Sequence, residues 1–577
     1  MVTRDGHTVA PGAGDGFGQL GALVPSGRGL NVAVLAHDSQ RRALQPWLQH
    51  FASSRTVVLS EDEPPEWRLE EAGVEHRVIR HGLKGVFRGI QSMPSPDVIV
   101  SLLSSEQLPV GAEDQLSLFA SIFPFIRKGG AYVVDRGAAG TSFDGFNAWL
   151  QIIAAAENVQ ETKELQPRDR ELARSMGTVA ASRDLLVVTK RVDHFVKLKE
   201  SNLSDVLPAR EPDLELRVLE TRRGGDLETR ARVVSHETDA PHISWPTAFE
   251  YPALALRQYD GRIALGGATL MYSGHTILPD SFRWHMSANP DNPHIRSTRA
   301  GFARIGSAYR PRRALSGAYY QLDSIHPNHF GHLMTEVISR LWGWDAAKRE
   351  NPKLKAVVLG NPQDRRPPTL AKTLFTAYGI DESDVVWVDE PVWVNSALSA
   401  TPMWHNANPH YAHPDIEETW DRLREGLKPP HERSPHERIF VSRGAGLGRR
   451  ACRNAGDVEE FFESRGFHIL YPEKLPLAQQ VALFRDARVI AGFGGSAMFN
   501  LMFAKSVETT IVLNHESYTA RNEHLFAALK GGDLHYFWSR ADVDRATTGR
   551  SKAAERSAWD FDFSRNGEAL TKLLAGL

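Results

Sequence analysis

The last third of the chain contains two apolar segments that each run into a polar or glycine-containing turn. Residues 437–443 read ERIFVSR, and residues 487–500 read ARVIAGFGGSAMFN. A strand, a tight turn and a helix in this order leave backbone N–H groups and the positive end of a helix available to hold phosphate. The sequence therefore predicts a phosphate-handling α/β domain, and a diphosphate site indicates a nucleotide-linked substrate.

Composition narrows the class of protein. The 577 residues suffice for several domains, and 41% hydrophobic with 24% charged residues is typical of globular proteins. Lys and Arg number 68 against 70 Asp and Glu, so no net field draws the whole chain onto nucleic acid. A single cysteine, Cys452, excludes an intramolecular disulfide framework and fits a reducing compartment.

The chain shows neither an N-terminal signal-peptide pattern nor an uncharged apolar run of about 18 residues. We expect a cytoplasmic protein without a transmembrane segment, and a peripheral association with a membrane stays open. No nucleic-acid partner is expected.

Residues 1–28 are rich in glycine and small residues and are expected to form a flexible lead-in. Between 29 and 200, apolar runs alternate with helical patterns, as in NVAVL at 31–35 and DVIVSLL at 97–103. Continuous apolar strands separated by helices predict a parallel sheet covered on both faces, and hence a Rossmann-like domain.

Residues 125–135 (FIRKGGAYVVD) resemble the late strand of S-adenosylmethionine-dependent methyltransferases. Such enzymes need glycine in the turn after the first strand, because side chains there block the approach of the cofactor. Here that turn reads LAHDSQR at 35–41 and has no glycine. We expect a degenerate methyltransferase-like domain that serves as a scaffold or docking module, with methyl transfer as an alternative function.

Four further regions follow. Short alternating segments predict a β-rich connector at 201–310, and an α/β pattern returns at 311–430. A second α/β unit is expected at 431–540, followed by a tail with a helix at 541–577. Two α/β units on either side of a Pro/His-rich stretch predict a cleft between them.

The helix expected to begin near Phe330 has a polar face. At about 100° per residue, His329, His332, Glu336 and Arg340 fall opposite the apolar residues. One interpretation is a solvated surface with a Glu336–Arg340 pair. The other is a functional face, which the histidine-dense sequence HPNHFGH at 326–332 favours.

This region and the two glycine turns resemble glycosyltransferase family 61. The ordered motifs are NHFGHLMTE at 328–336, SR at 442–443, RR at 449–450 and FGGSAMFN at 493–500, and the resemblance extends from about 261 to 538. That family includes bacterial capsular-polysaccharide proteins and eukaryotic xylosyl- and N-acetylglucosaminyltransferases.

The resemblance implies an α/β fold with a GT-B-like pair of Rossmann-like units, here preceded by the separate Rossmann-like domain and the connector. It also implies an inverting transfer from a nucleotide-sugar donor to a polysaccharide or glycoconjugate acceptor, with no essential metal and no cofactor. In this family a histidine usually precedes the glycine pair, and Phe493 takes its place here. A catalytically inactive assembly protein of surface-polysaccharide synthesis is therefore a further alternative.

Inverting transfer needs a base that takes the proton of the acceptor hydroxyl. Glu336 and His332 are the candidates, one as the base and the other orienting it, with His329 beside them; the sequence leaves the choice open. The acceptor-side candidates are Asn328, Trp404 and His405, of which the tryptophan is suited to stack on a sugar ring.

Arginine can neutralise phosphate oxygens bidentately, a role that a metal ion fills in other transferases. The donor-binding candidates are Arg443, Arg449, Arg450, Gly494, Gly495, Ser496 and Glu516. The two glycines are expected to offer backbone amides and Ser496 to cap the following helix. The histidines between 405 and 436 lack the spacing of a metal site, so no metal is expected.

Overall fold

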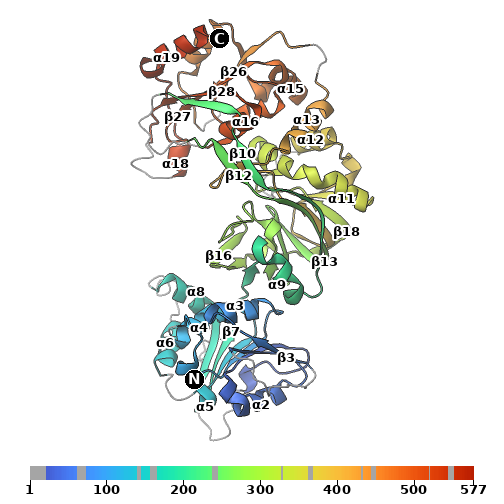
Figure 1. Cartoon of the computed structure of the whole chain (residues 1–577), viewed down its shortest axis with the longest axis vertical. Coiled ribbons are helices and arrows are strands. Elements are labelled where there is room, and N and C mark those ends of the chain that lie inside the picture. The colour runs from blue at the N-terminus through green and yellow to red at the C-terminus, as the bar shows by residue number, and fades with distance from the viewer. Residues whose placement is uncertain are drawn as a thin grey trace.

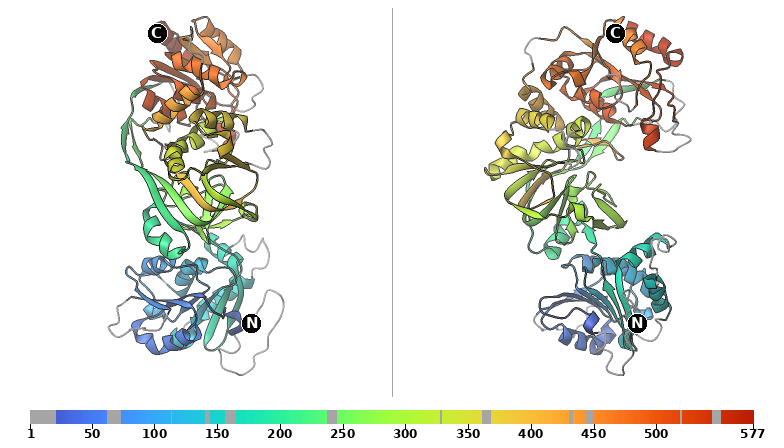
Figure 2. Two further views of the ribbon diagram at one scale, coloured as in Figure 1. Left: turned by 90° about the vertical axis from the view of Figure 1, so that its right-hand side faces the viewer. Right: turned by 180° about the vertical axis from the view of Figure 1, so that it is seen from behind.

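Three units follow one another along the molecule, with the two termini at opposite ends (Figure 1). The views from the side and from behind show the same arrangement (Figure 2). This computed structural model describes residues 21–61, 73–112, 114–139, 144–155, 165–236, 245–326, 329–360, 368–429, 433–443, 450–518, 520–543 and 551–577.

The N-terminal unit is a seven-stranded sheet in the order β3-β2-β1-β4-β5-β7-β6. Its strands are β1 (Asn31–Leu35), β2 (Arg55–Ser60), β3 (Val74–Val78), β4 (Val98–Ser101), β5 (Ala131–Asp135), β6 (Met176–Ala181) and β7 (Leu185–Lys190). Its longer helices are α2 (Arg41–His50), α3 (Leu83–Gln91), α4 (Gln115–Ile122), α5 (Arg136–Ala139), α6 (Asp144–Ala155) and α8 (Pro167–Ser175). Its short 3₁₀ turns are η1 (Gly21–Leu23), η2 (Asp38–Gln40), η3 (Ser105–Gln107) and η4 (Phe123–Phe125).

The pairs of β1 with β2 and β4 are parallel, and β7 runs antiparallel to β5. Neighbouring residues of one strand belong to different hydrophobic clusters: Ala33 of β1 lies in one cluster and Val34 in another. Because neighbouring strand residues point to opposite faces, both faces of the sheet are covered. This is the predicted α/β arrangement, with a sheet that is parallel except for β7, which runs antiparallel to both β5 and β6.

The middle unit is built on an eleven-stranded mixed sheet. Its strands are β8 (Phe195–Lys197), β9 (Glu215–Arg222), β13 (Leu254–Gly267), β14 (Leu270–Ser273), β15 (Thr276–Ile277), β16 (Ile295–Arg299), β17 (Phe302–Ile305), β18 (Arg313–Gln321), β19 (Lys355–Leu359), β20 (Val385–Val388) and β21 (Val392–Ala400). Its helical elements are η5 (Glu200–Asn202), α9 (Leu203–Arg210), η6 (Pro279–Ser281), η7 (Ser307–Tyr309), α10 (Phe330–His332), η8 (Leu333–Val337), η9 (Ile338–Gly343), α11 (Trp344–Glu350), α12 (Thr369–Tyr378), η10 (Glu382–Asp384) and α13 (Ile416–Gly426). Two small ribbons complete it, β10 (Gly225–Glu228) with β12 (Ala248–Tyr251) and β22 (Trp404–His405) with β23 (Tyr411–Ala412).

The predicted boundary at 310 falls within a single sheet. Strand β13, from the expected connector, pairs along its length with β21, from the expected acceptor-side unit. The regions 201–310 and 311–430 therefore contribute to one sheet, and β8 joins it from the region predicted to end at 200. Alternating polar and apolar residues show that a strand has one buried face, but they do not show which strand pairs with it.

The C-terminal unit is a six-stranded parallel sheet in the order β11-β28-β27-β26-β24-β25. Its strands are β11 (Ala231–Ser235), β24 (Arg438–Val441), β25 (His468–Leu470), β26 (Val489–Phe493), β27 (Thr509–His515) and β28 (Gly532–Ser539). Its helical elements are α14 (Ala455–Glu463), η11 (Pro472–Lys474), α15 (Leu477–Asp486), η12 (Ser496–Phe503), α16 (Asn522–Lys530), α18 (Lys552–Glu555) and α19 (Phe563–Ala575).

The expected tail belongs to this unit. Leu570 and Leu574 of α19 are buried in one hydrophobic cluster with Phe440 and Phe537 of the sheet. A second cluster contains residues of both the middle and the C-terminal units, among them Leu341 and Met498. The two units therefore share a hydrophobic core.

The junction between the N-terminal and middle units is held by Arg210 of α9. Its side chain is 1% exposed, and burial lowers its pKa to about 10. Nε donates to Thr276 Oγ1 (2.9 Å) and Nη2 to Ser95 Oγ (2.9 Å). Nη1 donates to the carbonyl oxygens of Gln91 (3.4 Å) and Met93 (3.3 Å). One guanidinium thus connects the two units.

We expect Arg210→Met to lower the free energy of unfolding by about 3 kcal/mol, because it leaves several buried acceptors unpaired. Urea unfolding followed by tryptophan fluorescence measures this loss. Arg217→Met is the matched control, since Arg217 is 42% exposed and its ion pair with Glu350 lies at the surface. Equal effects of the two substitutions would contradict the assigned role of Arg210.

Candidate functional site

The C-terminal sheet has a reversal of strand order at β24 and β26. These strands are parallel neighbours, with Val441 opposite Gly492, while β25 lies on the far side of β24 and β27 continues beyond β26. Ligands of open α/β sheets bind in the crevice at the carboxyl ends of such strands. Arg443 follows β24, and the turn at 494–496 follows β26, so both reach this crevice.

The middle sheet has a second reversal at β18. This strand runs parallel to β19 on one side and to β21 on the other. The chain leaves the carboxyl end of β18 towards Asp323 and His326 and that of β21 towards Pro402 and Trp404. The same rule therefore places a second crevice at these residues.

The helical segment after Phe330 is not the single α-helix that the sequence predicts. A turn of α-helix (α10) is followed by a π-helix (η8), a 3₁₀-helix (η9) and then α11. Glu336 lies within the π-helical turn, and such turns frequently occur at functional sites.

The interpretation of its polar face as a solvated surface is wrong for Glu336 and Arg340. Arg340 is 2% exposed and donates to Ser399 Oγ (3.3 Å) and to the carbonyl oxygen of Ala400 (3.1 Å) at the end of β21. Glu336 is also largely covered, with a side chain that is 10% exposed. Glu336 and Arg340 are therefore buried against the end of the sheet, whereas the His332 side chain is 28% exposed and His329 lies at the surface.

His332 and Glu336 contact each other one turn apart. His332 Nδ1 lies 2.8 Å from Glu336 Oε1, and Arg283 Nη1 lies 3.1 Å from the same oxygen. Burial raises the pKa of Glu336, but the hydrogen bond to His332 and the charge of Arg283 outweigh it, so this pKa is below its usual value. A carboxylate only accepts hydrogen bonds, so Nδ1 carries the proton and Nε2 is left as a proton acceptor.

A cavity of about 250 Å³, the β18 cavity, adjoins this pair. The residues lining it include Thr269, Arg283, Asn292, His326, His332, Glu336, Arg340 and Trp404. Thr269 and its neighbour Ala268 have φ values of +65° and +50°, and Asp323 Oδ2 accepts a hydrogen bond from the Thr269 amide (3.1 Å). Left-handed backbone in two consecutive residues other than glycine stores strain, which is typical of functional sites.

A larger cavity of about 640 Å³, the β26 cavity, lies at the ends of β24 and β26. It is lined by His329, Phe330, Arg443, Arg450, Pro472, Glu473, Gln480, Ser496, Ala497 and Asn500. The first two residues come from the middle unit and the others from the C-terminal unit. The units approach closely here, because a Cβ atom on Gly331 would lie 3.2 Å from Ser496 Cβ.

Two arginines stand together in the β26 cavity. Burial, with the neighbouring charge of Arg450, lowers the pKa of Arg443 to about 10. The Arg450 guanidinium lies 3.9 Å from the centre of the Tyr518 ring, and its buried Nη1 has no hydrogen-bond partner in the described structure. A ligand bearing negative charge would relieve the repulsion between these cations.

The glycine turn does not offer the amides that the sequence predicts. The Gly494 amide donates to Leu513 O (3.0 Å), and the Gly495 amide donates to the buried Glu523 Oε1 (2.7 Å). Gly495, not Ser496, occupies the cap position of η12. The amides of Ser496 and Ala497 precede the first bond of this helix, from Met498 N to Gly495 O, and so are the ones available to a ligand.

Gly495 has a steric role. Its φ is +138°, and a Cβ atom there would lie 2.3 Å from Arg443 Nη2. We expect Gly495→Ala to lower the free energy of unfolding by about 1–3 kcal/mol through backbone strain and to displace the arginine. Urea unfolding and nucleotide binding measure the two effects. Gly456→Ala in α14, where a Cβ meets nothing within 4 Å, should leave both unchanged; a neutral Gly495→Ala would contradict this role.

Other predicted site residues lie elsewhere. Glu516 forms an ion pair with Arg565 (3.0 Å) and is not among the residues that line the β26 cavity. His405 is buried and bonded through Nδ1 to the carbonyl oxygen of Pro409 (2.7 Å). Trp404 lines the β18 cavity but also packs on Phe526, with ring centroids 4.5 Å apart. Asn328 and Arg449 fall outside the described residues.

Phe493 points into the core rather than into the β26 cavity. It is 4% exposed and packs against Phe440 and Trp559, with ring centroids 5.3 and 6.0 Å away. Phe493 is therefore not among the residues that line this cavity.

Arg283, Asp323 and Asn292 were not identified from the sequence. They lie in turns or loops whose position depends on the folded sheet, and no local pattern marks them. Burial raises the pKa of Asp323 to about 6. The amide of Asn292 bonds to the carbonyl oxygens of Ala268 (2.7 Å) and Ser281 (2.8 Å), which holds the strained turn in place.

His326, His329 and His332 pack ring against ring, with centroids 4.9 Å (326 to 332) and 5.1 Å (329 to 332) apart. Within the described ranges, no group of three or more His, Cys, Asp or Glu residues has the arrangement of a metal site. In the same ranges, no helix combines the length and apolar character needed to span a bilayer.

The N-terminal sheet reverses its strand order between β1 and β4. Gln40 crosses this point: Nε2 donates to Leu102 O (2.5 Å), to Gln107 Oε1 (2.8 Å) and to Ala138 O (3.2 Å). The crevice where a cofactor of such a sheet would approach the backbone is therefore occupied by a hydrogen-bonded side chain.

Comparisons with known proteins agree with part of this description. Residues 330–512 match the family model described as Glycosyltransferase 61, which supports transferase activity for this part of the chain. The matched segment includes the His332–Glu336 pair, Arg443, Arg450 and the glycine turn. The search of curated proteins found no match.

Some solved structures resemble a smaller part of the chain. The methyltransferase MycE of the mycinamycin biosynthetic pathway, with Mg and SAH, is 15% identical over 28% of this chain, with a TM-score of 0.22. The antibiotic-resistance methyltransferase Kmr is 7% identical over 30% of this chain and 92% of its own length (TM-score 0.19). This chain covers 42% of the MycE chain. At these TM-scores the likeness supports no conclusion about function.

Proposed function

We propose that this protein is an inverting glycosyltransferase with a GT-B-like pairing of its middle and C-terminal units. It moves a hexose or pentose from a nucleotide-sugar donor to a hydroxyl group of a cytoplasmic polysaccharide or glycoconjugate precursor, and it needs no metal. One observation carries the proposal: His329 lines the β26 cavity, while His332 and Glu336 on the same helical segment line the β18 cavity. Donor and acceptor would meet at this segment.

The donor diphosphate binds in the β26 cavity. Arg443 and Arg450 supply positive charge for the phosphates. The first amides of η12, at the positive end of that helix, face the same cavity. Charge from arginine takes the place of a metal ion at the leaving group.

The acceptor hydroxyl enters from the β18 cavity, and His332 is the base. Its Nε2 takes the hydroxyl proton while the acceptor oxygen bonds to the anomeric carbon. The bond from that carbon to the diphosphate oxygen breaks on the opposite face, and its electron pair leaves with the diphosphate. The lowered pKa of Glu336 keeps it a carboxylate, which fixes the His332 ring and stabilises the imidazolium that forms.

A panel of nucleoside diphosphates and nucleotide sugars tests the proposal. One nucleotide class should raise the melting temperature, and its sugar derivative should be hydrolysed or transferred, with release of the nucleoside diphosphate. If no nucleotide stabilises the protein and S-adenosylmethionine does, methyl transfer by the N-terminal unit replaces this proposal. A nucleotide that binds without turnover would instead support the inactive assembly protein.

A further inference from the structure

A third cavity lies between the N-terminal and middle units, away from the glycosyltransferase-like segment. Its volume is about 1320 Å³, and we call it the interdomain cavity. One wall is α3, with the loops that follow β3 and β4, and the other is formed by β8, η5, α9 and the turn at 300–301. The junction beside it is fixed by Arg210, which bonds to Ser95 and to the carbonyl oxygens of Gln91 and Met93.

The interdomain cavity is basic. Lys84, Arg88, Lys197 and Lys199 line it, and Asp205 is the one carboxylate among its described lining residues. Lys197 is engaged, because Nζ bonds to Asn289 Oδ1 (2.6 Å) and Pro290 O (2.8 Å). The other three cations form no ion pair with any residue in the described ranges. Unpaired cations around one hollow concentrate anions there.

The rim of the cavity has unusual backbone geometry. His81 has a φ of +72°, which is rare for a residue other than glycine, and Gly82 and Gly111 have φ values of +57° and +91°. The loops bearing them are joined by a bond from Leu83 N to Val110 O (2.9 Å). A Cβ on Gly82 would lie 2.1 Å from that carbonyl oxygen, so the turn requires glycine. The first amides of helix α3 are used within this rim, because Gly85 N and Val86 N donate to Gly82 O (2.8 and 3.1 Å). The turn therefore fixes the shape of the rim, and the cations of the wall are left to attract an anion.

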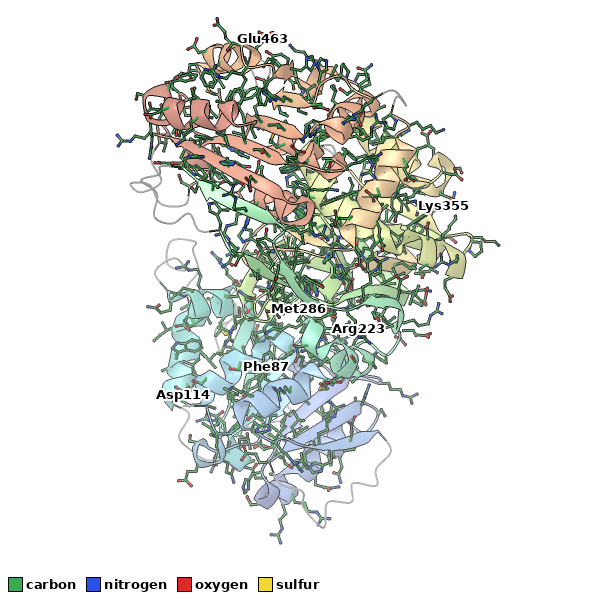
Figure 3. All side chains as sticks on the ribbon, turned by 45° about the horizontal axis from the view of Figure 1, so that its top comes forward. Phe87, Asp114, Arg223, Met286, Lys355 and Glu463 are labelled. Carbon is green, nitrogen blue, oxygen red and sulfur yellow. The ribbon has the colours of Figure 1, made fainter. Side chains whose placement is uncertain are left out.

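Part of the wall is apolar. Leu83, Phe87 and Val206 line the cavity beside the cations. Figure 3 labels Phe87 on the side of the N-terminal unit that faces the middle unit. Its ring packs on Phe125 and Phe302, with centroids 4.9 and 5.8 Å away, which holds it in place. A ligand that fits both parts of the wall carries phosphate at one end and a ring at the other.

We propose that the interdomain cavity binds an organic diphosphate, with the phosphates held by Lys84, Arg88 and Lys199. This site is separate from the proposed donor site, because none of its lining residues is shared with the β26 cavity. The S-adenosylmethionine sulfonium is a poor match, since the cavity presents cations.

Calorimetry on the full chain carrying Arg443→Ala tests the proposal, because that substitution disables the proposed donor site. The probes are ADP and inorganic pyrophosphate. Both should bind, and adding Lys84→Ala, Arg88→Ala and Lys199→Ala should weaken binding at least about tenfold, as loss of several charged hydrogen bonds predicts. If ADP binds more tightly than pyrophosphate, the adenine ring contacts the apolar wall. If the two bind equally, the cavity recognises the diphosphate alone.

Lys84→Arg with Lys199→Arg keeps the charges and should retain binding, which separates loss of charge from loss of fold. Circular dichroism should show the same folded protein in all variants. The proposal is overturned if neither probe binds the Arg443→Ala protein or if removing the three cations leaves the affinity unchanged. Binding of polygalacturonate without binding of either phosphate would likewise overturn it, in favour of an anionic glycan.

Discussion

Glu336→Gln is expected to lower kcat for sugar transfer about 1000-fold with little change in KM. Glutamine keeps the size of the side chain but removes the charge that stabilises the His332 imidazolium. Its amide can also donate to His332 Nδ1, which moves the ring proton to Nε2 and leaves no acceptor for the substrate proton. Steady-state release of nucleoside diphosphate in the presence of acceptor measures this loss.

Glu350→Gln is the control for this substitution. Glu350 ends α11 on the same helical stretch, its side chain is 48% exposed, and its partner is the surface residue Arg217. Activity within about twofold of the wild type is expected for such a surface change. If Glu336→Gln keeps more than a tenth of the wild-type kcat, Glu336 does not hold the base in position.

Arg443→Ala is expected to weaken binding of the nucleoside diphosphate about 100-fold and to lower kcat/KM by a similar or larger factor. The unliganded protein should not be less stable, because burial and the charge of Arg450 already disfavour the Arg443 cation. Thermal unfolding with and without nucleotide therefore separates the two effects. Without nucleotide, the melting temperature of the Arg443→Ala protein should equal or exceed that of the wild type. With nucleotide, the variant should no longer show the rise in melting temperature that the wild type shows.

Arg488→Ala provides the matched control for this prediction. Arg488 lies just before β26 in the same unit, is 49% exposed and is paired with Glu508 and Glu437 at the surface. Its removal should leave nucleotide binding unchanged. An Arg443→Ala protein that is strongly destabilised yet still responds to nucleotide would show that this arginine is structural.

Much of the fold could be predicted from local sequence. The apolar runs that became β1, β4 and β26 are continuous because both faces of a parallel sheet are buried, and this pattern is visible without knowing the partners. The extent of the middle unit was not predictable in the same way. Strand β13 pairs with β21, which lies far along the chain, and nothing in either strand specifies the other.

The candidate site likewise has features that local sequence predicts and features that depend on the folded structure. The spacing of His332 and Glu336 predicted that they share a face, and they are in contact. The burial of Arg340 was missed, because the periodicity of one helix does not reveal what packs against its polar side. Arg283 reaches Glu336 from another part of the chain, so only the folded structure identifies it.

The central claim is that the β26 cavity receives the diphosphate of the donor beside the segment that carries the base. A crystal structure with the nucleoside diphosphate selected by thermal shift tests it most directly. We predict phosphate oxygens within hydrogen-bond distance of both Arg443 and Arg450, in the cavity that His329 also lines. A diphosphate bound only in the interdomain cavity, with the β26 cavity empty, would contradict the claim.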